Sequence, residues 1–394
     1  MNKLVKRYVL IVTCFILLVG IFNYNLVFAD KIDSFNKLVP KSEKINFENL
    51  TIEDGLSSNF ITTIFQDSRG YIWIGTDDGL NQYNGNYIVE YNYSDGLAST
   101  YISAICEDEY GNIWVGTRGG LSIINSKTEE IKNIKYDNSK SGISHYNVTA
   151  IYKDSQNTMW VGTEKGLNKY DYETKTFIKY YDEDSGGVLS NSYITNIKEV
   201  KDEYIVIGSK CGASVVDMKQ DIVYKSSFDS NEYDYIYNIE VDKNGDIWFA
   251  TKNGIHKYDY ESNTLNAFTI DIDKEIYSDI NSILCDESNN LWFASSNGII
   301  KYNEEKELTT LYKADKLFIN SLNSDNIHCF FEDSNGLLWI GTDYGISKLN
   351  ITQQISNKVD LILKENGIEE TSFNSIIEES EGDLWIGTKY HGLV

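Results

Sequence analysis

The sequence contains little proline, little arginine and no excess of basic residues. Pro40 is the only proline among 394 residues, and 59 acidic side chains outnumber 35 basic ones, for a net charge of −24. Nucleic acid is therefore excluded as a partner, because phosphate binding needs a basic face. An acidic surplus is typical of a soluble surface. The scarcity of proline and the presence of 29 tyrosines favour short strands joined by polar turns.

Long hydrophobic runs are missing except at the N-terminus. Lys3, Lys6 and Arg7 precede a mostly apolar run over residues 8–22, and residues 27–29 offer a cleavage site for a signal peptidase. This order is typical of an export signal, and an uncleaved run could also serve as an anchor. We therefore expect residues 1–29 to be a signal peptide or membrane anchor and 30–44 a linker. The remaining chain is then extracytoplasmic, exported and associated with the cell membrane.

The cysteines and histidines indicate neither a disulfide framework nor a metal site. The five cysteines include no C-x-x-C pair. Cys106, Cys285 and Cys329 fall in expected strands, where we expect small core residues, and Cys211 falls in a turn as a candidate exposed thiol. The four histidines lie in four different repeats. We therefore predict no metal site, and the sequence indicates no cofactor.

One phrase of fourteen residues is repeated along the chain. It reads DSRGYIWIGTDDGL at 67–80, and close copies lie at 108–121, 154–167 and 333–346. A further copy carries Val206 where the others carry tryptophan, and successive copies are 41 to 47 residues apart. This period matches one four-stranded propeller blade or a helical repeat. All seven tryptophans occupy the equivalent position: Trp73, Trp114, Trp160, Trp248, Trp292, Trp339 and Trp385.

Local pattern separates the two alternatives. In the first repeat, the runs 61–67, 71–76, 79–83 and 87–93 are short and lack the i, i+3, i+4, i+7 stripe of a helix. Turns of the D-x-x-G, T-x-x-G and N-G types stand between such runs. Four short strands per period predict an all-β fold, a β-propeller of seven or eight four-stranded blades.

The recurring tryptophans and glycines have structural roles. We expect each Trp to pack between adjacent sheets, and the Asp of each D-x-x-G turn to bond the N–H groups of that turn. The turn glycines, among them Gly70 and Gly336, close the first hairpin of each blade at positive φ. A second set follows the Trp where sheets crowd together: Gly75, Gly116, Gly162, Gly341 and Gly387.

The two ends of the repeat region leave the number of blades open. Residues 45–52 resemble a fourth strand with no first three strands before it, so this strand would close the ring by joining the last blade. The propeller region 45–394 contains eight repeats, and the eighth is incomplete at Val394. Either residues 45–52 complete that eighth blade, or seven blades close and the eighth repeat begins a second propeller.

The repeats resemble the two-component regulator propeller repeat, D-x-x-G-x-[IL]-W-[IV]-G-T-x-x-G-[IL]-x-x-[FY] after an apolar strand. Repeats 1, 2, 3 and 7 fit closely, repeats 5 and 6 carry Phe-Ala for the apolar-Gly pair, and repeat 4 lacks both the Trp and the turn. The resemblance implies the ligand-sensing ectodomain of a membrane receptor whose output is a histidine kinase or a GGDEF-type diguanylate cyclase. Such a receptor can form a homodimer.

Neither output domain is encoded in this chain. It contains no helical His-box, no Gly-rich ATP lid and no GGDEF string. We expect no enzyme in this chain, and an output domain would lie downstream. Attachment to the membrane would then use the N-terminal segment or a missing C-terminal helix.

Enzymatic chemistry has little support from the residues. The DSRGYIW turn resembles the Asp-box of sialidases, a class that holds its substrate carboxylate with an arginine triad. This chain has only three arginines in all, and Arg7 lies in the N-terminal segment. No paired-acid arrangement stands out, because Asp and Glu occur throughout the turns.

The residues support a binding site better than an enzymatic one. In a propeller, the loops that lead into the first strands and those that join second to third strands share one face around the central funnel. Repeats 2 to 5 each place a cation on this rim, although the protein is acidic. Aromatic faces beside cations suit an anionic glycan or oligosaccharide. The predicted ligand site comprises Arg118, Lys165, Lys210, Lys252, Tyr101, Tyr193 and Tyr235.

Three classes of function follow. The first is a sensory ligand-binding ectodomain. The second is a structural or protein–protein interaction propeller of the cell surface. The third and most distant is a secreted carbohydrate-active enzyme. Reading the gene beyond Val394 would separate them, because a membrane helix followed by a kinase or cyclase belongs only to the first.

Overall fold

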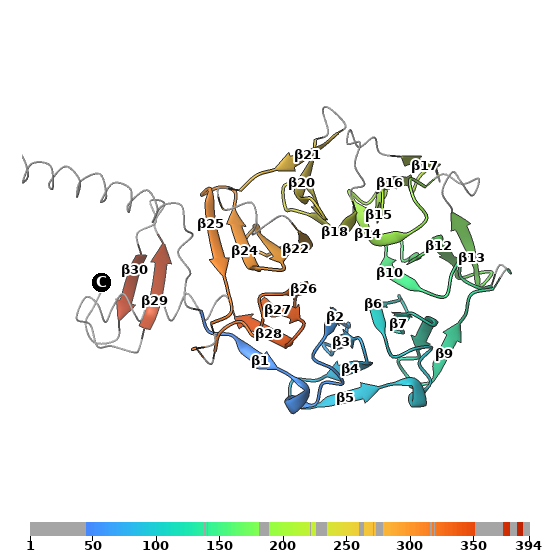
Figure 1. The fold of residues 1–394 in the computed structure, drawn as a ribbon, viewed down its shortest axis with the longest axis horizontal. Helices are drawn as coiled ribbons and strands as arrows, with labels where there is room; N and C mark the ends of the chain where they lie inside the picture. The colour runs from blue at the N-terminus through green and yellow to red at the C-terminus, as the bar shows by residue number, and fades with distance from the viewer. Residues whose placement is uncertain are drawn as a thin grey trace, which may run out of the picture.

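The computed structural model describes residues 45–137, 139, 141–180, 189–220, 222–225, 235–259, 264–270, 272, 279–315, 317–318, 320–350, 373–378 and 384–388. These residues form seven four-stranded antiparallel sheets around a central axis (Figure 1). Among them, helix is limited to two single turns, Ile52–Asp54 and Tyr93–Asp95. The prediction of an all-β propeller is confirmed. The predicted signal segment and linker, residues 1–44, lie outside the described residues.

Six blades are each built from four consecutive strands. Blade 1 comprises β2 (Ile61–Gln66), β3 (Ile72–Thr76), β4 (Gly79–Tyr83) and β5 (Ile88–Tyr91), with β2 innermost. Blades 2 to 6 repeat this order with β6 (Ile102–Glu107), β7 (Ile113–Thr117), β8 (Gly120–Ile124), β9 (Ile131–Ile134); β10 (Val148–Lys153), β11 (Met159–Thr163), β12 (Gly166–Asp171), β13 (Thr176–Tyr180); β14 (Ile194–Val200), β15 (Tyr204–Ser209), β16 (Gly212–Asp217), β17 (Ile222–Lys225); β18 (Ile236–Val241), β19 (Ile247–Thr251), β20 (Gly254–Asp259), β21 (Thr264–Phe268); and β22 (Ile280–Cys285), β23 (Asn290–Ser295), β24 (Gly298–Asn303), β25 (Leu308–Tyr312).

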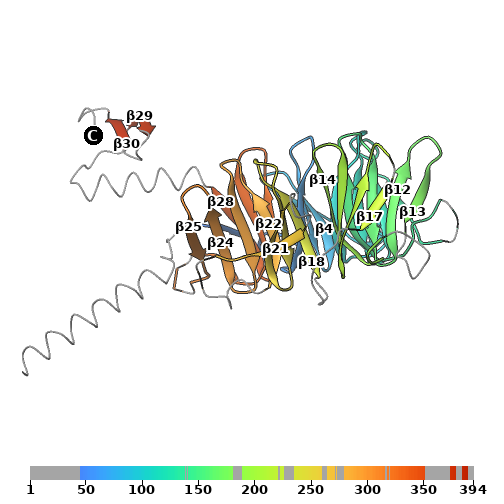
Figure 2. The same ribbon diagram turned by 90° about the horizontal axis from the view of Figure 1, so that it is seen from above.

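The seventh blade joins the two ends of the ring. It contains β26 (Ile327–Glu332), β27 (Leu337–Thr342), β28 (Gly345–Asn350) and, as its outer strand, β1 (Glu48–Leu50). Strand β1 pairs antiparallel with β28, with Glu48 opposite Lys348 and Leu50 opposite Ile346. The N-terminal strand therefore closes the ring as predicted, and it does so at seven blades. Seen edge-on in Figure 2, the strands run from one face of the disc to the other, so the loops gather on two faces.

The eighth repeat does not join the ring. Its strands β29 (Phe373–Glu378) and β30 (Leu384–Thr388) pair with each other in a two-stranded sheet. The eight-blade alternative is therefore wrong. The other alternative, that this repeat begins a second propeller, stays a prediction. The backbone of Trp385 and Gly387 lies in β30, while the Trp385 side chain and the packing around Gly387 lie outside what the structure describes.

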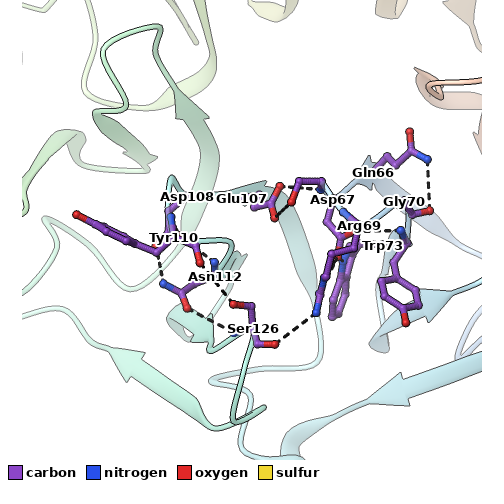
Figure 3. Close-up of polar contacts among 12 residues, drawn as sticks. Gln66, Asp67, Arg69, Gly70, Trp73, Glu107, Asp108, Tyr110, Asn112 and Ser126 are labelled. Atoms are coloured by element: carbon purple, nitrogen blue, oxygen red, sulfur yellow. Dashed lines mark hydrogen bonds and ion pairs between the residues drawn. The ribbon is translucent and has the colours of Figure 1, made fainter.

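The tryptophans fill the spaces between the sheets. Each of the six described Trp side chains is at most 3% exposed, as their predicted packing requires. Each also donates its indole N–H to the Asp that begins the turn of its own blade, for example Trp73 Nε1 to Asp67 Oδ2 at 3.0 Å (Figure 3). The same Asp accepts the turn amides of Arg69 and Tyr71, both at 3.0 Å. Bonding of Asp to the turn amides is confirmed, and the Asp–Trp bond is a feature the sequence did not reveal.

The two sets of glycines answer two different constraints. Gly70 and Gly336 adopt φ of 89° and 74°, in the left-handed region that glycine tolerates. Gly75 instead lies where blades 1 and 2 meet, and a Cβ there would stand 2.7 Å from Ile102 Cγ2 and from Thr63 Cγ2. A Cβ on Gly116, Gly162 or Gly341 would meet the next blade equally closely. The predicted crowding at these positions is confirmed.

Candidate functional site

The first strand of every blade contains a β-bulge at its second residue. In blade 1, Ile61 lies opposite Thr76 and Thr63 opposite Gly75, so the ladder skips Thr62. The other six blades show the same shift. Bulges commonly redirect a side chain beside a functional site. We call the seven skipped residues the bulge ring: Thr62, Ser103, Thr149, Thr195, Tyr237, Asn281 and His328.

The bulge ring lines the central channel of the propeller. A cavity of about 260 Å³ is walled by the first strands of all seven blades, and every member of the bulge ring contributes to its wall. All seven side chains are polar. The sequence analysis did not select these residues, because their chemical type changes from blade to blade while their position in the strand is constant.

A second cavity opens above the channel at blades 2 to 5. It has a volume of about 240 Å³, and its walls include four of the seven predicted ligand residues, Tyr101, Arg118, Tyr193 and Tyr235. Ser103, Thr149, Thr195 and Tyr237 of the bulge ring line both cavities. We call this second cavity the mouth pocket, since it leads into the channel.

The loops predicted to share one face do meet there. The amide of Arg118 donates to the carbonyl of Tyr101 at 3.4 Å, and that of Lys210 to the carbonyl of Tyr193 at 3.2 Å. The amide of Lys252 likewise donates to the carbonyl of Tyr235 at 3.1 Å. Main-chain bonds therefore fix each rim loop to the loop that leads into the first strand of the same blade.

Two rim cations stack on tyrosine rings. The guanidinium of Arg118 lies 3.5 Å from the centre of the Tyr101 ring, and the ammonium of Lys210 lies 3.5 Å from that of Tyr193. Cation–π contacts of this kind hold a charged group over an aromatic face. Lys210, Lys165 and Lys252 are exposed on the rim loops and do not line the mouth pocket.

Blade 3 departs from the predicted pattern of rim cations. Its rim loop places Glu164 where blades 2, 4 and 5 place a cation, and Lys165 comes one residue later. Asn147 Nδ2 donates to Glu164 Oε1 at 2.7 Å, and His145 Nδ1 lies 3.8 Å from Glu164 Oε2. Burial, together with Tyr235 and Glu164, raises the pKa of Tyr193, so its phenol stays protonated and able to donate. The mouth pocket therefore combines one cation, Arg118, with phenols, and Asn147 of its wall holds the carboxylate of Glu164.

The rim is acidic on the side away from these blades. Asp77 and Asp343 occupy the first position of the rim loops in blades 1 and 7, and Asp279 precedes the first strand of blade 6. Asp343 accepts bonds from Ser324 Oγ at 2.5 Å and Asn326 Nδ2 at 3.3 Å. The face around the channel is therefore divided into a basic, aromatic arc and an acidic arc.

One cluster of carboxylates lies outside the mouth pocket. Among the described residues, Asp242, Asp246 and Glu304 bring oxygens within 4.8 Å of one another. Lys257 Nζ already lies 2.7 Å from Asp246 Oδ2 and 3.2 Å from Glu304 Oε1. The lysine ammonium therefore balances the charge that a metal ion would otherwise neutralise.

Solved structures of other proteins share this fold. The chain is 24% identical to the extracellular domain of one hybrid two component system from B. thetaiotaomicron, with a TM-score of 0.68 over 89% of this chain and 48% of the other. A second such domain from B. thetaiotaomicron gives 22% identity and a TM-score of 0.66 over 87% and 44%. The chain thus spans about half the length of these structures.

A virginiamycin B lyase from Staphylococcus aureus shares the fold at lower identity. It is 15% identical, with a TM-score of 0.61 over 78% of this chain and 99% of the lyase. No curated protein matches the chain. These likenesses establish the fold and leave the activity open, because sites rather than folds carry function.

The fold and the mouth pocket define a repeat-built, seven-bladed β-propeller with a cavity at one end of its channel. The two component regulator propeller family matches five segments, residues 55–78, 96–119, 142–165, 232–253 and 321–344. These five segments therefore match the two component regulator propeller repeat. Within the described residues, no helix has the length and apolar character needed to cross a membrane.

Proposed function

We propose that this chain is the extracytoplasmic, ligand-sensing propeller of a membrane signalling receptor of the histidine kinase or diguanylate cyclase type. The observation that carries the proposal is the mouth pocket, because repeats that match the two component regulator propeller family here surround a cavity lined by four tyrosines and Arg118. The extracellular domains of the two similar B. thetaiotaomicron systems support the same assignment.

The ligand is an anionic glycan or oligosaccharide. Tyr101 and Tyr193 offer aromatic faces on which a sugar ring can stack, and Arg118 offers a guanidinium that binds a carboxylate or sulfate in a bidentate manner. Loops on a rigid scaffold are where recognition sites usually lie. Binding happens in this chain, and the output reaction belongs to a domain beyond it.

The test compares two triple variants with equal charge change. Lys165, Lys210 and Lys252 on the rim are replaced with serine, and acidic oligosaccharides are titrated by calorimetry. The control replaces three exposed lysines in the hairpins of the opposite face, Lys127, Lys175 and Lys306. We expect the rim variant to bind roughly tenfold or more weakly and the control to bind as the wild type does.

Two results would contradict the proposal. Binding that survives the rim changes undiminished would move the site to another face. An equal loss in both triple variants would show that long-range charge, rather than the rim, draws the ligand. A third variant, Arg118→Gln, tests the pocket itself, since this guanidinium lines the mouth pocket.

A further inference from the structure

The turn that leads into the first strand of a blade is held by a side chain that accepts the amide two residues further on. Ser58 accepts the amide of Phe60, Ser99 that of Tyr101, Asn191 that of Tyr193 and Ser324 that of Asn326. In blade 3 the acceptor is Nδ1 of His145, 3.2 Å from the amide of Asn147. Among these described turns, blade 3 alone uses a side chain that titrates near neutral pH.

A second possible partner lies beside the same ring nitrogen. Nδ1 of His145 is 3.8 Å from Glu164 Oε2. In blade 7 the equivalent Ser324 serves both partners at once, since its hydroxyl accepts the amide of Asn326 and donates to Asp343 at 2.5 Å. A histidine nitrogen can do only one of these, because it accepts when unprotonated and donates when protonated. The protonation state of His145 therefore decides whether Nδ1 bonds the amide or the carboxylate.

The surroundings of His145 favour the neutral ring at pH 7. Burial lowers the pKa of His145 below its ordinary 6.5, and Lys165 acts in the same direction, whereas Glu164 and the main chain of Asn147 oppose them. The other titratable groups that face the ring are the phenols of Tyr136 and Tyr146, whose rings lie 6.3 and 4.0 Å from it. At pH 7 the neutral imidazole therefore leaves the charge of the Glu164 carboxylate uncompensated.

Both partners of His145 act on the wall of the mouth pocket. Asn147 lines the pocket, and its Nδ2 donates to Glu164 Oε1 at 2.7 Å. Glu164 also interacts with the phenol of Tyr193, a second residue of the wall. A change of partner at His145 therefore alters the contacts and the charge at this edge of the pocket.

We propose that His145 is a positioning residue that couples ligand binding in the mouth pocket to the uptake of a proton. On protonation, Nδ1 releases the amide of Asn147 and donates to the carboxylate of Glu164. This inference rests on the proposed function, because it concerns the anionic ligand of that pocket. A positive charge beside Glu164 reduces the repulsion between its carboxylate and the ligand, so the ligand binds more tightly as the pH falls. By linkage, the bound ligand favours protonation of His145.

The experiment uses a replacement that the chain itself supplies. His145→Asn puts in blade 3 the residue type that Asn191 supplies to the same turn of blade 4, and asparagine does not titrate. Glu164→Gln removes the acid, and His256→Asn on β20 is the control. Each protein is titrated by calorimetry at pH 7.5 and pH 5 with trigalacturonate and with a κ-carrageenan tetrasaccharide. Without ligand, NMR follows the His145 ring and the Asn147 amide over the same range.

We expect the wild type and His256→Asn to bind roughly fivefold more tightly at pH 5 than at pH 7.5. The affinities of His145→Asn and Glu164→Gln should change less than twofold between these pH values. In the wild type, the Asn147 amide signal should move with the same midpoint as the His145 ring. Glu164→Gln should shift that midpoint to lower pH, because it removes the group that favours the charged ring. Glu164→Gln decides the outcome if His145→Asn lowers the melting temperature.

Three outcomes would overturn the inference. Binding by the wild type that is equal or weaker at pH 5, or a pH dependence that His145→Asn retains in full, removes the coupling and leaves the proposed function standing. An Asn147 amide that does not respond to the titration of His145 removes the change of partner, again without touching the proposed function. Failure of both oligosaccharides to bind the wild type at either pH contradicts the anionic glycan ligand and the inference together.

Discussion

The aspartate that starts the first hairpin of a blade accepts hydrogen bonds both from its own turn and from the Trp of that blade. Asp154 accepts two amides of the turn through Oδ1 and the indole N–H of Trp160 through Oδ2, the last at 2.8 Å. Blade 4 has neither partner, since Val200 and Val206 occupy these positions and are both buried. An Asp retained there would lack its indole donor, and a buried carboxylate that loses a donor is costly. The absence of the Asp and the absence of the Trp in blade 4 therefore go together.

Replacing the residue at the Trp position with alanine should consequently lower the free energy of unfolding more in a blade with the Asp–Trp pair than in blade 4. We expect Trp160→Ala to lower the free energy of unfolding by about 3–5 kcal/mol, from lost burial and cavity formation. The matched change Val206→Ala removes far less buried surface and should cost less than half as much. Urea denaturation followed by circular dichroism measures both. Equal losses would show that the tryptophan is not the main packing element of its blade.

Residue positions could be predicted from sequence where one residue type recurs. Trp and Gly stand out in register because Trp fills the space between sheets in six of the seven blades. Gly75 and its equivalents recur where blades touch, with Ala250 and Ala294 as the small residues of blades 5 and 6. The bulge ring could not be found in this way. Its members share a skipped position in the ladder, and hydrogen bonding alone reveals that. Glu164 was likewise hidden, because the next residue, Lys165, satisfied the expected cation.

Neighbouring blades are joined by a contact between one turn and the next first strand. The amide and hydroxyl of Ser68 donate to Glu107 at 2.8 and 2.7 Å, and Ser155 binds Glu199 in the same way. At the last junction, the amide of Ser334 donates to Gln66 Oε1 at 2.8 Å. A residue at the end of each of these first strands, or one before it in β14, therefore ties its blade to the preceding one.

The junction of blades 6 and 7 should depend on pH. Burial, then Asp286 and Glu287, raise the pKa of Glu332 above its ordinary 4.5. Its charged form is disfavoured in the folded state, so Glu332 destabilises the fold above that raised pKa and ceases to do so below about 4.5. We expect Glu332→Gln to raise the melting temperature at pH 7 and to have no effect at pH 4, as measured by calorimetry.

The equivalent change at blade 2 provides the control. Both oxygens of Glu107 accept bonds from Ser68, and a glutamine can accept only through one of them. Glu107→Gln should therefore lower the melting temperature at pH 7. If both substitutions move it in the same direction, like-charge repulsion does not distinguish Glu332 from Glu107.

Blade 4 should open most readily. Its first hairpin places Lys201 and Asp202 at φ of 57° and 52°, where residues other than glycine are strained. The turn keeps one main-chain bond, from the amide of Glu203 to the carbonyl of Val200 at 3.3 Å. We expect the amides of β14 and β15 to show the weakest exchange protection among the first and second strands. Hydrogen exchange with mass spectrometry checks this, and protection equal to blade 2 would contradict it.

At the scale of the whole molecule, the sequence predicted the architecture but left the number of blades open. Residues 45–52 carry the pattern of a fourth strand, which fits the edge of a seventh or an eighth blade equally well. The choice depends on where the inner strands meet around the channel, and short-range pattern does not contain that information. In the structure, Phe47 N donates to Asn320 O and Asn49 Nδ2 to Ser321 O, both contacts that tie β1 to the approach of blade 7.

The closure by β1 has a mechanical consequence. Glu48 pairs with Lys348 toward the C-terminal end of β28, while Leu50 pairs with Ile346 near its N-terminal end. A force applied at residues 45 and 350 therefore pulls β1 and β28 apart from one end. The three residue pairs between the two strands separate one after another. We expect optical tweezers to record a first step at low force that frees β1 alone. A single rupture of the whole disc would contradict this. Tension between residues 45 and 350 would thus release β1 first. The edge of β28 would become exposed, while the other six blades stay folded.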